Sequence, residues 1–429
     1  MRGEPLPPAV RLGQVAVRLG QVALFTAGTL VWIAMISVLS SPSARGHRVA
    51  GAVARLAERL RGAFLKGGQL LGTRADLIGP ALAAALSRLH DDVEAMSGGN
   101  ALRAAEEAFD RVPREVAQAV RRPPVASGSI ACVYRAELDH GALAIKIRRP
   151  GIAHRITADI AIARLLARVL GRFAVFRRVP LDDMVEQIGA SLIGQLDFAA
   201  EADNLARLRD DLADVPGVVV PAVVPELCGD GVIAMEFVEG LDRTAVDRLP
   251  SATRETAVAR LVGAVYHMLF MSGFIHVDLH QGNVYFRTDG TVVILDAGFA
   301  FQMSDMAATK FTRFFAGMIR GDGESCADIL LSTVRGADAH ADAGEFRQSV
   351  ADLVTRNAGV VARDFSLSSF SVELFDLQRR HRLFAEPEFV FPLLCLLALE
   401  GTVKAHHPLM DFQLQAAPHV MHGLLQRAE

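Results

Sequence analysis

Residues 274–298 constrain the fold of this chain more than any other stretch. Two short apolar runs, residues 284–286 and 292–295, lie on either side of Thr288-Asp289-Gly290. An Asp-Gly pair supplies the positive φ angles of a tight turn, so this pattern predicts a β-hairpin. Polar residues just before the first run and just after the second would then meet at the open end of the hairpin.

Three such polar residues have the spacing of a phosphoryl-transfer site. Asp278 and Asn283 follow His276 as in the kinase catalytic loop H-R-D-x-x-x-x-N, and Asp296-Ala297-Gly298 stands where kinases have D-F-G. Such a site needs Mg²⁺ held by hard oxygen ligands and a carboxylate that faces the acceptor. We therefore assign Asn283 and Asp296 as metal ligands and Asp278 as the acceptor-side carboxylate. A loop aspartate more often caps a turn, and either aspartate alone would be interpreted in that way.

A lysine upstream favours the functional interpretation. Residues 143–147 form a β-like run close to the V-A-I-K strand of kinases, with Lys146 in the run. Residues 125–134 precede it as a small-residue loop that leads into a strand, where kinases have a glycine-rich loop. A lysine in a strand usually faces solvent. Here the loop, the lysine strand, an acidic helix, the catalytic loop and Asp-x-Gly follow the kinase order of parts.

Four stretches together resemble the UbiB family of atypical kinase-like proteins, which is linked to ubiquinone and other isoprenoid-lipid metabolism. Residues 64–76 contain Lys66-Gly-Gly-Gln69, similar to the K-x-G-Q signature that ordinary kinases lack. The other three stretches are the alanine-rich nucleotide loop at 126–130, the lysine strand and R-P-G-I turn at 143–152, and the core at 274–298. The resemblance covers roughly residues 50–415.

The resemblance implies an α+β, two-lobed protein-kinase-like fold with an added N-terminal helical extension, helix-rich overall. The expected parts are an N-terminal segment 1–45 with a membrane helix at 22–39, a helical extension 46–120, a kinase-like N-lobe 121–240 and a kinase-like C-lobe 241–429.

The resemblance also implies that the chain binds ATP, or ADP, together with Mg²⁺. Lys146 would hold the phosphates, Glu201 would pair with Lys146 and orient it, and the strand at 232–240 would be the hinge whose backbone amides meet adenine. The catalytic assignments are thus Asp278, Lys146 and Glu201. The residues assigned to the nucleotide are Ala126, Ser127, Gly128, Ser129, Lys146, Met235, Glu236, Phe237 and Val238.

The signature residues Lys66 and Gln69 are three positions apart and so share one side of a helix. The resemblance implies that the extension packs over the active site and aims both side chains into it. Taken without the resemblance, both residues would be interpreted as solvent-facing helix residues.

Helical periodicity over residues 182–211 predicts one helix, with Asp197 and Glu201 four positions apart on one face. The family has E-x-D at this point, and Gln195 replaces the glutamate while Asp197 remains. A glutamine can hydrogen-bond Lys66 but cannot pair with its charge. We therefore expect a looser contact between the extension and the lobe.

Two further residues depart from the family pattern. Gly128 stands where the family's loop has an alanine beside Ser129, and glycine lets backbone approach a phosphate more closely. Ala297 replaces the middle residue of D-F-G and removes any aromatic switch there. Asp296 is kept, so the site is not interpreted as dead.

Residues 22–39 contain no charge over eighteen positions, the lower limit for a transmembrane helix. A signal peptide would export an ATP-dependent domain away from ATP, and a buried amphipathic helix is the alternative. Arginines are more frequent after this segment than before it, which places the kinase-like domain on the cytoplasmic side. They are Arg45, Arg48, Arg55, Arg59 and Arg61 against Arg2, Arg11 and Arg18. We expect an N-terminal membrane anchor.

The composition fits a globular chain with a large core, because 51% of the residues are hydrophobic and 22% charged. A net charge of −3 gives no indication of nucleic-acid binding. The cysteines lie far apart and match neither C-x-x-C nor a secreted disulfide framework. Buried free thiols are therefore expected at Cys132, Cys228, Cys326 and Cys395.

The function implied by this pattern is that of a UbiB-like atypical kinase or ATPase, with slow hydrolysis or phosphoryl transfer at a membrane. The expected partners are a membrane lipid or isoprenoid precursor and lipid-biosynthesis proteins, with no nucleic acid. One alternative is a small-molecule phosphotransferase of the aminoglycoside-kinase type, which Lys66-Gly-Gly-Gln69 argues against. The other is a nucleotide-binding scaffold without turnover, which Gln195 and Ala297 favour.

Overall fold

The structure is a computed structural model. It describes residues 12–39, 41–72, 80–86, 88–89, 94–139, 141–170, 181–277, 279, 282–333, 343–360, 362–381, 383 and 387–427. The chain forms two compact units. The first comprises Met1–Ala200 and Val224–Phe237, and the second comprises Glu201–Val223 and Val238–Glu429. The two units are not the same as the four predicted domain ranges, which remain a prediction.

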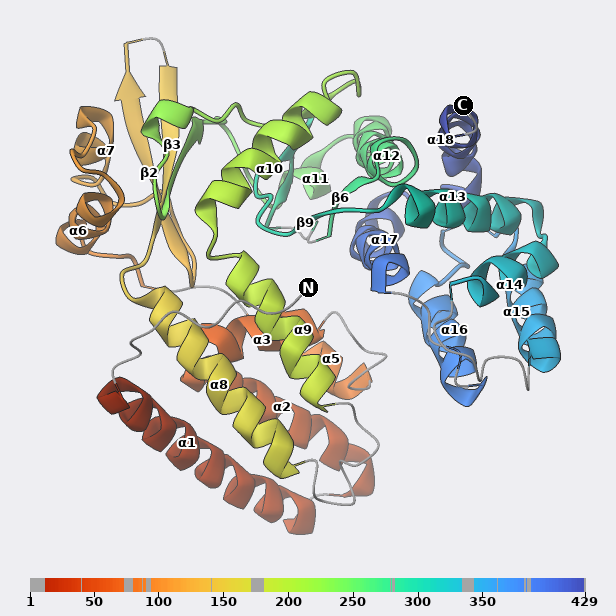
Figure 1. The fold of residues 1–429 in the computed structure, drawn as a ribbon, viewed down its shortest axis with the longest axis horizontal. Helices are drawn as coiled ribbons and strands as arrows, with labels where there is room; N and C mark the ends of the chain where they lie inside the picture. Colours follow the sequence, from red (N-terminus) through yellow and green to blue (C-terminus); the bar gives the residue numbers. More distant parts are fainter. Residues whose placement is uncertain are drawn as a thin grey trace. The chain divides into compact units, whose positions relative to one another are not determined.

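Helices that precede and follow strands β1–β3 in the sequence pack together as one part of the first unit (Figure 1). They are α1 (Leu12–Leu39), α2 (Pro42–Leu60), α3 (Gly62–Gly72), α5 (Pro80–Leu86), α8 (Ile152–Leu170) and α9 (Leu181–Gly194). A short link joins α1 to α2, so the two helices pack side by side in opposite directions. Residues predicted as a helical extension thus pack with α8 and α9, which follow the lysine strand in the sequence.

The other part of the first unit is an antiparallel sheet in the order β1-β2-β3-β5. Its strands are β1 (Ala126–Ser127), β2 (Ala131–Leu138), β3 (Gly141–Arg148) and β5 (Val232–Glu236). Helices α6 (Gly98–Ala108) and α7 (Arg114–Ala119) pack against it (Figure 1). Because side chains alternate along a strand, Ile145 and Ile147 enter the core of this layer while Lys146 lies on the other face.

The second unit contains the predicted hairpin. Strands β7 (Val284–Phe286) and β8 (Val292–Ile294) pair antiparallel, with Val284 opposite Ile294, and Gly290 has a φ of 78°. The Asp289 side chain accepts a hydrogen bond of 2.9 Å from the Thr291 N–H, which fixes the turn. The prediction from the Asp-Gly pair is confirmed. Strand β4 (Val218–Val219) extends this sheet, and β6 (Phe274–His276) pairs with β9 (Ala300–Gln302) in a separate ladder.

Helices dominate the rest of the second unit. They include α11 (Ala245–Arg248), α12 (Ser251–Tyr266), the π-helix η2 (His267–Ser272), α13 (Asp305–Arg320), α14 (Gly323–Leu331), α15 (Ala343–Asn357), α16 (Leu367–His381), α17 (Pro387–His406) and α18 (Phe412–Gln426). Their core contains a group of aromatic rings around Tyr266, Phe270 and Phe315, with centroids 5.0–6.2 Å apart. Helix α17 buries Leu396 and Leu399 in this unit, so its apolar run is a core helix.

The prediction of a single helix over residues 182–211 is wrong, because the helix is interrupted at residues 195–197. Helix α9 ends at Gly194 and α10 (Phe198–Asp211) begins three residues later, crossing from the first unit into the second. The Asp197 side chain accepts a hydrogen bond of 2.9 Å from the Ala200 N–H. Asp197 therefore caps α10 instead of sharing a helix face with Glu201, since an aspartate satisfies the otherwise unpaired N–H groups of a helix start.

All four cysteines are free thiols, and Cys132, Cys326 and Cys395 are buried as predicted. Burial raises the pKa of Cys326 and of Cys395 to about 12. Cys228 is only half-buried; its thiol donates to the Val224 carbonyl at 3.3 Å, and burial raises its pKa as well.

Candidate functional site

The strand that leads into the predicted catalytic loop is tied to the Asp-Ala-Gly segment. His276 is fully buried at the end of β6, and its Nε2 atom bonds the backbone carbonyl of Asp296. The Val277 N–H donates to the Phe299 carbonyl at 3.0 Å, continuing the β6–β9 ladder. His276 thus fixes Asp296 relative to the loop. Asp278 itself lies outside the described residues.

The two predicted metal ligands emerge at the same end of the hairpin. Val284 pairs with Ile294, and the Leu295 N–H donates to the Asn283 carbonyl at 2.9 Å. The next residue along the second strand is Asp296, whose Oδ1 accepts a 2.9 Å hydrogen bond from the Gly298 N–H. Asn283 is 9% exposed and Asp296 half-buried, and both residues lie at the same end of the hairpin.

The oxygen atoms of a carboxamide and a carboxylate are ligands that fit Mg²⁺, a hard cation. Among the described residues, no group of three or more His, Cys, Asp and Glu side chains is arranged to hold a metal ion. Mg²⁺ is usually bound by one or two protein oxygens and keeps waters and substrate phosphates as its other ligands. Asn283 and Asp296 supply such oxygens, and Mg²⁺ there would neutralise charge on bound phosphates.

Helix α10 brings two side chains to the Asp-Ala-Gly turn. The Asn204 side chain donates to the buried Ala297 backbone carbonyl at 3.1 Å. Glu201 is 2% exposed, and its Oε2 would lie 3.6 Å from a Cβ built on Gly298. The glycine therefore leaves room for Glu201 beside Asp296, whose Oδ1 would lie 3.2 Å from that Cβ. Its burial shows that Glu201 is not a surface acid. Its ion pair with Lys146 remains a prediction.

Lys146 occupies the middle of the sheet in the first unit. It lies opposite Val133 of β2 and Ile233 of β5, and its side chain is half-buried. The Lys146 ammonium lies 5.2 Å from the centroid of the Phe198 ring, within the range of a cation–π interaction. The buried Phe198 therefore helps to position the lysine predicted to bind phosphates.

The predicted nucleotide loop is held by Arg149, a residue that the sequence analysis did not assign. Its Nε donates to the Gly128 carbonyl at 2.8 Å, and its Nη2 donates to Ser127 Oγ at 2.8 Å and to the Glu94 carbonyl at 2.8 Å. The Gly128 N–H donates to the Ala131 carbonyl at 2.9 Å and closes the turn. The sequence contained an indication of this role, because Arg149 is the first residue of the R-P-G-I turn that follows the lysine strand.

The predicted hinge residues lie at the end of β5. Met235 is buried and Glu236 exposed, and the Phe237 N–H donates to the Ala142 carbonyl on β3 at 3.0 Å. In an antiparallel ladder, adjacent residues turn their backbone groups to opposite edges. The backbone of Glu236 therefore faces the outer edge, where adenine is predicted to bind. Val238 is the first residue after the boundary of the first unit.

The signature segment lies on α3. Lys66 is half-buried, while the side chain of Gln69 lies outside the described part of the structure, as do Arg74 and Asp76. A Cβ on Gly67 would lie 3.3 Å from Ile188, and one on Gly68 would lie 2.8 Å from Leu89. Two glycines in the signature thus let α3 pack closely on its neighbours. Gln195 is half-buried in the turn between α9 and α10.

Residues 88–330 match the ABC1 atypical kinase-like domain, which is more than half of the chain. The chain belongs to this family. The matched region includes the nucleotide loop, the lysine strand and the Asp-Ala-Gly turn described above.

Relatives of this chain carry the name of the family that the sequence motifs resemble. The chain is 26% identical over 379 residues to a "Probable protein kinase UbiB" of Tolumonas auensis, covering 86% of this chain and 69% of the relative. A protein of the same name from Pseudomonas aeruginosa is 27% identical over 386 residues, covering 88% and 72%. The predicted UbiB resemblance is confirmed.

The fold is also similar to a solved structure. The complex of Rv3197 with erythromycin from Mycobacterium tuberculosis matches with a TM-score of 0.50 and 18% identity, covering 81% of this chain and 93% of that chain. At this identity the similarity concerns the fold alone. Together with the family match, it confirms the predicted kinase-like α+β fold with N-terminal helices.

Proposed function

We propose that the chain binds Mg-ATP and uses it for slow hydrolysis or phosphoryl transfer, in support of ubiquinone or other isoprenoid-lipid metabolism at a membrane. The observation that carries this proposal is the arrangement at the Asp-Ala-Gly turn. There His276 bonds the Asp296 backbone, Asn283 lies at the same hairpin end, and buried Glu201 lies beside Gly298. A turn built only for stability would not need a buried carboxylate, a carboxamide and a second carboxylate.

Each polar residue has one role in this proposal. Asn283 and Asp296 hold the metal, Lys146 holds the phosphates, and Asp278 positions the acceptor or an attacking water. Glu201 orients Lys146 through the predicted ion pair. The loop around Gly128, held by Arg149, places its backbone N–H groups at the phosphates.

The membrane setting is supported by one helix of the structure. Among the described helices, only the stretch 17–38 within α1 is long and apolar enough to cross a bilayer, with a mean hydropathy of 1.8. The proposed partners are a membrane lipid or isoprenoid precursor and lipid-biosynthesis proteins, with the kinase-like domain on the cytoplasmic side.

Steady-state release of phosphate from Mg-ATP tests this proposal, using the full chain with lipid vesicles. Asp296→Asn is expected to lower turnover by about 100-fold or more, because removing one group that stabilises the transition-state charge typically costs that much. Asp289→Asn is the matched control, since Asp289 is an exposed turn residue of the same hairpin. It is expected to change turnover by less than about twofold.

Equal turnover in the wild-type chain and Asp296→Asn would rule out the assigned metal site. Binding of Mg-ATP without any turnover above the no-protein rate, even with vesicles present, would replace the enzyme proposal by a nucleotide-binding scaffold.

A further inference from the structure

The first unit contains a large cavity, and most of its lining residues have no role in the function proposed above. Its volume is about 1260 Å³, and its walls come from α1, the α2–α3 turn, the start of α6 and the start of α8. Ser129 and Arg149 form its border with the nucleotide loop. All the lining residues belong to the first unit, so the cavity is a feature of that unit alone.

The cavity is strongly basic. Five arginines and His154 line it, with Glu94 as the acidic residue among the lining side chains. Arg149 bonds two carbonyls and a hydroxyl, and Arg103 bonds the amide oxygen of Asn100. The side chains of Arg61 and Arg155 make no ion pair with any residue that the structure describes. Guanidinium groups without carboxylates predict an anionic ligand, and their fork geometry matches phosphate.

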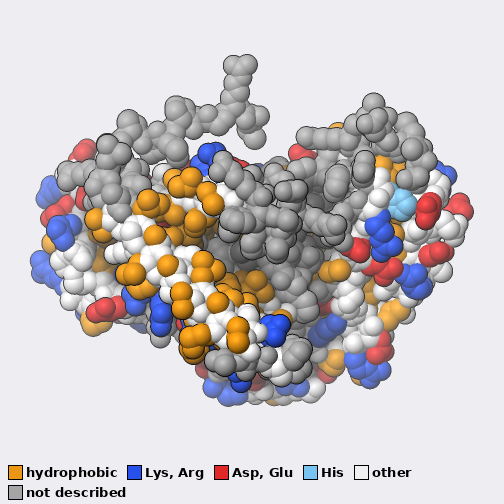
Figure 2. Space-filling view, turned by 90° about the horizontal axis from the view of Figure 1, so that it is seen from below, with side chains coloured by type: hydrophobic (Ala, Val, Ile, Leu, Met, Phe, Trp, Pro, Cys, Tyr) orange, Lys and Arg blue, Asp and Glu red, His pale blue; other side chains and the backbone are white. Residues whose placement is uncertain are grey.

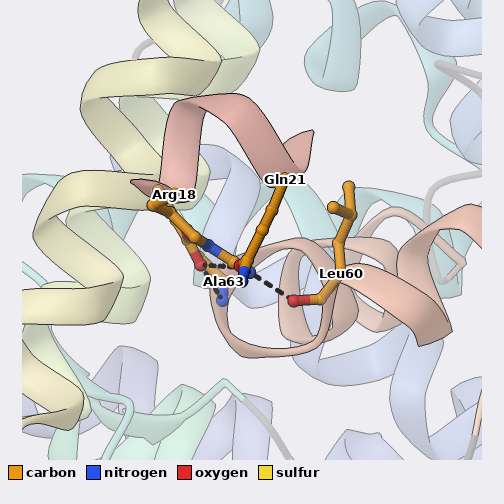
Figure 3. Close-up of polar contacts among 5 residues, drawn as sticks. Arg18, Gln21, Leu60 and Ala63 are labelled. Carbon is orange, nitrogen blue, oxygen red and sulfur yellow. Dashed lines mark hydrogen bonds and ion pairs between the residues drawn. The ribbon is translucent and has the colours of Figure 1, made fainter. Parts of the chain in front are cut away.

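The fifth arginine holds the cavity wall together. Arg18 of α1 pairs with Asp159 of α8 through contacts of 2.6 and 3.0 Å, and it also donates to the Leu60 carbonyl at 2.7 Å (Figure 3). The same carboxylate accepts the Ala63 N–H at 3.2 Å at the start of α3. Four helices thus meet at one buried ion pair. The cavity therefore has a fixed frame.

The turn beside this frame presents Arg61 to the cavity. Arg61 has a φ of 53° and Gly62 a φ of 57°, and a Cβ on Gly62 would lie 2.8 Å from Asp159 Oδ2. Arg61 is the only non-glycine residue with positive φ in the described chain. An unusual backbone conformation that places a cation at a cavity is typical of a functional site.

One wall of the cavity continues into an apolar helix face. Val17 lines the cavity and is 66% exposed, and no charged residue occurs from 19 to 39. Figure 2 shows hydrophobic side chains along this helix, and the exposed ones include Leu24, Trp32 and Val38. An exposed apolar face of this length marks a surface that something covers.

The packing of α2 against α1 indicates that the apolar face of α1 is covered by the interfacial region of a bilayer. Helix α2 carries exposed charges along its length, and burying them in hydrocarbon would be costly. They are Arg45, Arg48, Arg55, Glu58 and Arg59. Helix α1 packs on α2 and is tied to α8 through the Arg18–Asp159 ion pair. It therefore fits in the plane of the membrane surface, where the arginines of α2 would contact anionic head groups. This arrangement differs from a helix that crosses the bilayer alone.

We propose that the cavity binds the phosphate or diphosphate head of an anionic lipid whose chain lies along α1 in the membrane interface. The head group contacts Arg61, Arg155 and Arg103, and the N-terminus of the long helix α8 adds backbone N–H groups. This site rests on the membrane role proposed above and names the chemistry of its lipid.

Trp32, the single tryptophan of the chain, gives a direct readout because it lies on the exposed face of α1. The full chain is titrated with phosphatidylcholine vesicles, with or without phosphatidic acid, in EDTA to keep Mg²⁺ from the nucleotide site. The Trp32 fluorescence and its quenching by brominated lipid are recorded, and inorganic pyrophosphate is added as a soluble competitor. We expect at least tenfold tighter binding to vesicles with phosphatidic acid, reversed by pyrophosphate.

Arg61→Gln/Arg155→Gln is the test variant, and both residues are exposed, so its fold is expected to persist. Arg121→Gln/Arg168→Gln removes the same charge from exposed sites of the same unit outside the cavity. The preference for phosphatidic acid should fall at least tenfold in the first variant and less than twofold in the second. Equal losses in both would overturn the cavity assignment in favour of general surface charge. Pyrophosphate binding without any vesicle preference would assign the cavity to a free phosphate compound.

The Mg-ATP response separates this proposal from the proposed function. Both double variants should retain the wild-type thermal shift with Mg-ATP. A wild-type chain that prefers phosphatidic acid but gives no Mg-ATP shift would contradict the enzyme proposal and leave the lipid site standing.

Discussion

Replacing Asp159 with alanine is expected to lower the free energy of unfolding of the first unit by about 3–5 kcal/mol, since this is the usual cost of removing one partner of a buried ion pair. The Asp159 side chain has no exposed surface and that of Arg18 is 9% exposed. The substitution leaves the guanidinium buried without a counter-charge, and the Ala63 N–H loses its acceptor. Helices α1 and α3 should therefore detach together.

Urea unfolding followed by Trp32 fluorescence measures this loss, because the tryptophan reports on α1. Asp230→Ala is the matched control in the same unit, since Asp230 pairs with Arg148 at 3.0 Å but its side chain is 81% exposed. An exposed pair contributes about 0–1 kcal/mol. Arg18→Met/Asp159→Asn should recover most of the loss, since no unpaired charge remains. A difference between Asp159→Ala and Asp230→Ala of less than about 1 kcal/mol would contradict the role of the buried pair.

Gly423→Ala is expected to destabilise the second unit by about 3 kcal/mol, the upper part of the range for an overpacked core. A Cβ at this position of α18 would collide with the Phe270 carbonyl of the π-helix η2, and it would lie 3.0 Å from Arg427 Nη1. Backbone cannot rotate away as a side chain can. Because η2 leads through Gly273 into β6, the collision would also displace His276.

Gly401→Ala is the control for this change. Gly401 is exposed within α17, and a Cβ there would meet no atom within 4 Å. Alanine should stabilise that helix by about 0.5–1 kcal/mol, because glycine is a poor helix former. Urea unfolding monitored by circular dichroism should give shifts of opposite sign for the two variants. Shifts of the same sign and size would show that the close approach at Gly423 does not constrain the fold.

Local turn chemistry explains what could be predicted from the sequence. The Asp289-Gly290 pair is a local signal for the hairpin turn, and the pairing of Val284 with Ile294 then brings Asn283 to the same end as Asp296. The relative positions of Asn283 and Asp296 therefore follow from the hairpin turn between them and can be predicted without knowledge of the tertiary structure.

The break at Asp197 shows where a local pattern misled. Leu192 and Leu196 are both buried and continue the helical spacing through the break. The apolar spacing therefore gave no indication of the helix cap at Asp197. Apolar periodicity indicates which side of a helix is buried, but it does not indicate whether the helix is continuous. The opposing indication was Asp197 itself, because an aspartate at this position can cap a new helix by accepting a hydrogen bond from the N–H three residues later, here that of Ala200.

Contacts between distant residues could not be predicted. Arg18 and Asp159 lie 141 positions apart, and nothing in the charge-free run after Arg18 indicates that the helix packs on α8. The burial of Glu201 against Gly298 and the contacts of Arg149 with the nucleotide loop likewise depend on the folded backbone.

Thermal unfolding of the full chain with and without Mg-ATP tests the central claim most directly. The full chain is required because α1 is packed into the first unit through Arg18. A nucleotide that binds only the folded state adds about 2.7 kcal/mol of stability at a hundredfold excess over its dissociation constant. We predict a Mg²⁺-dependent rise in the unfolding temperature that Asp296→Asn abolishes and Asp289→Asn retains. No rise at millimolar Mg-ATP in a well-folded wild-type chain would contradict the nucleotide site.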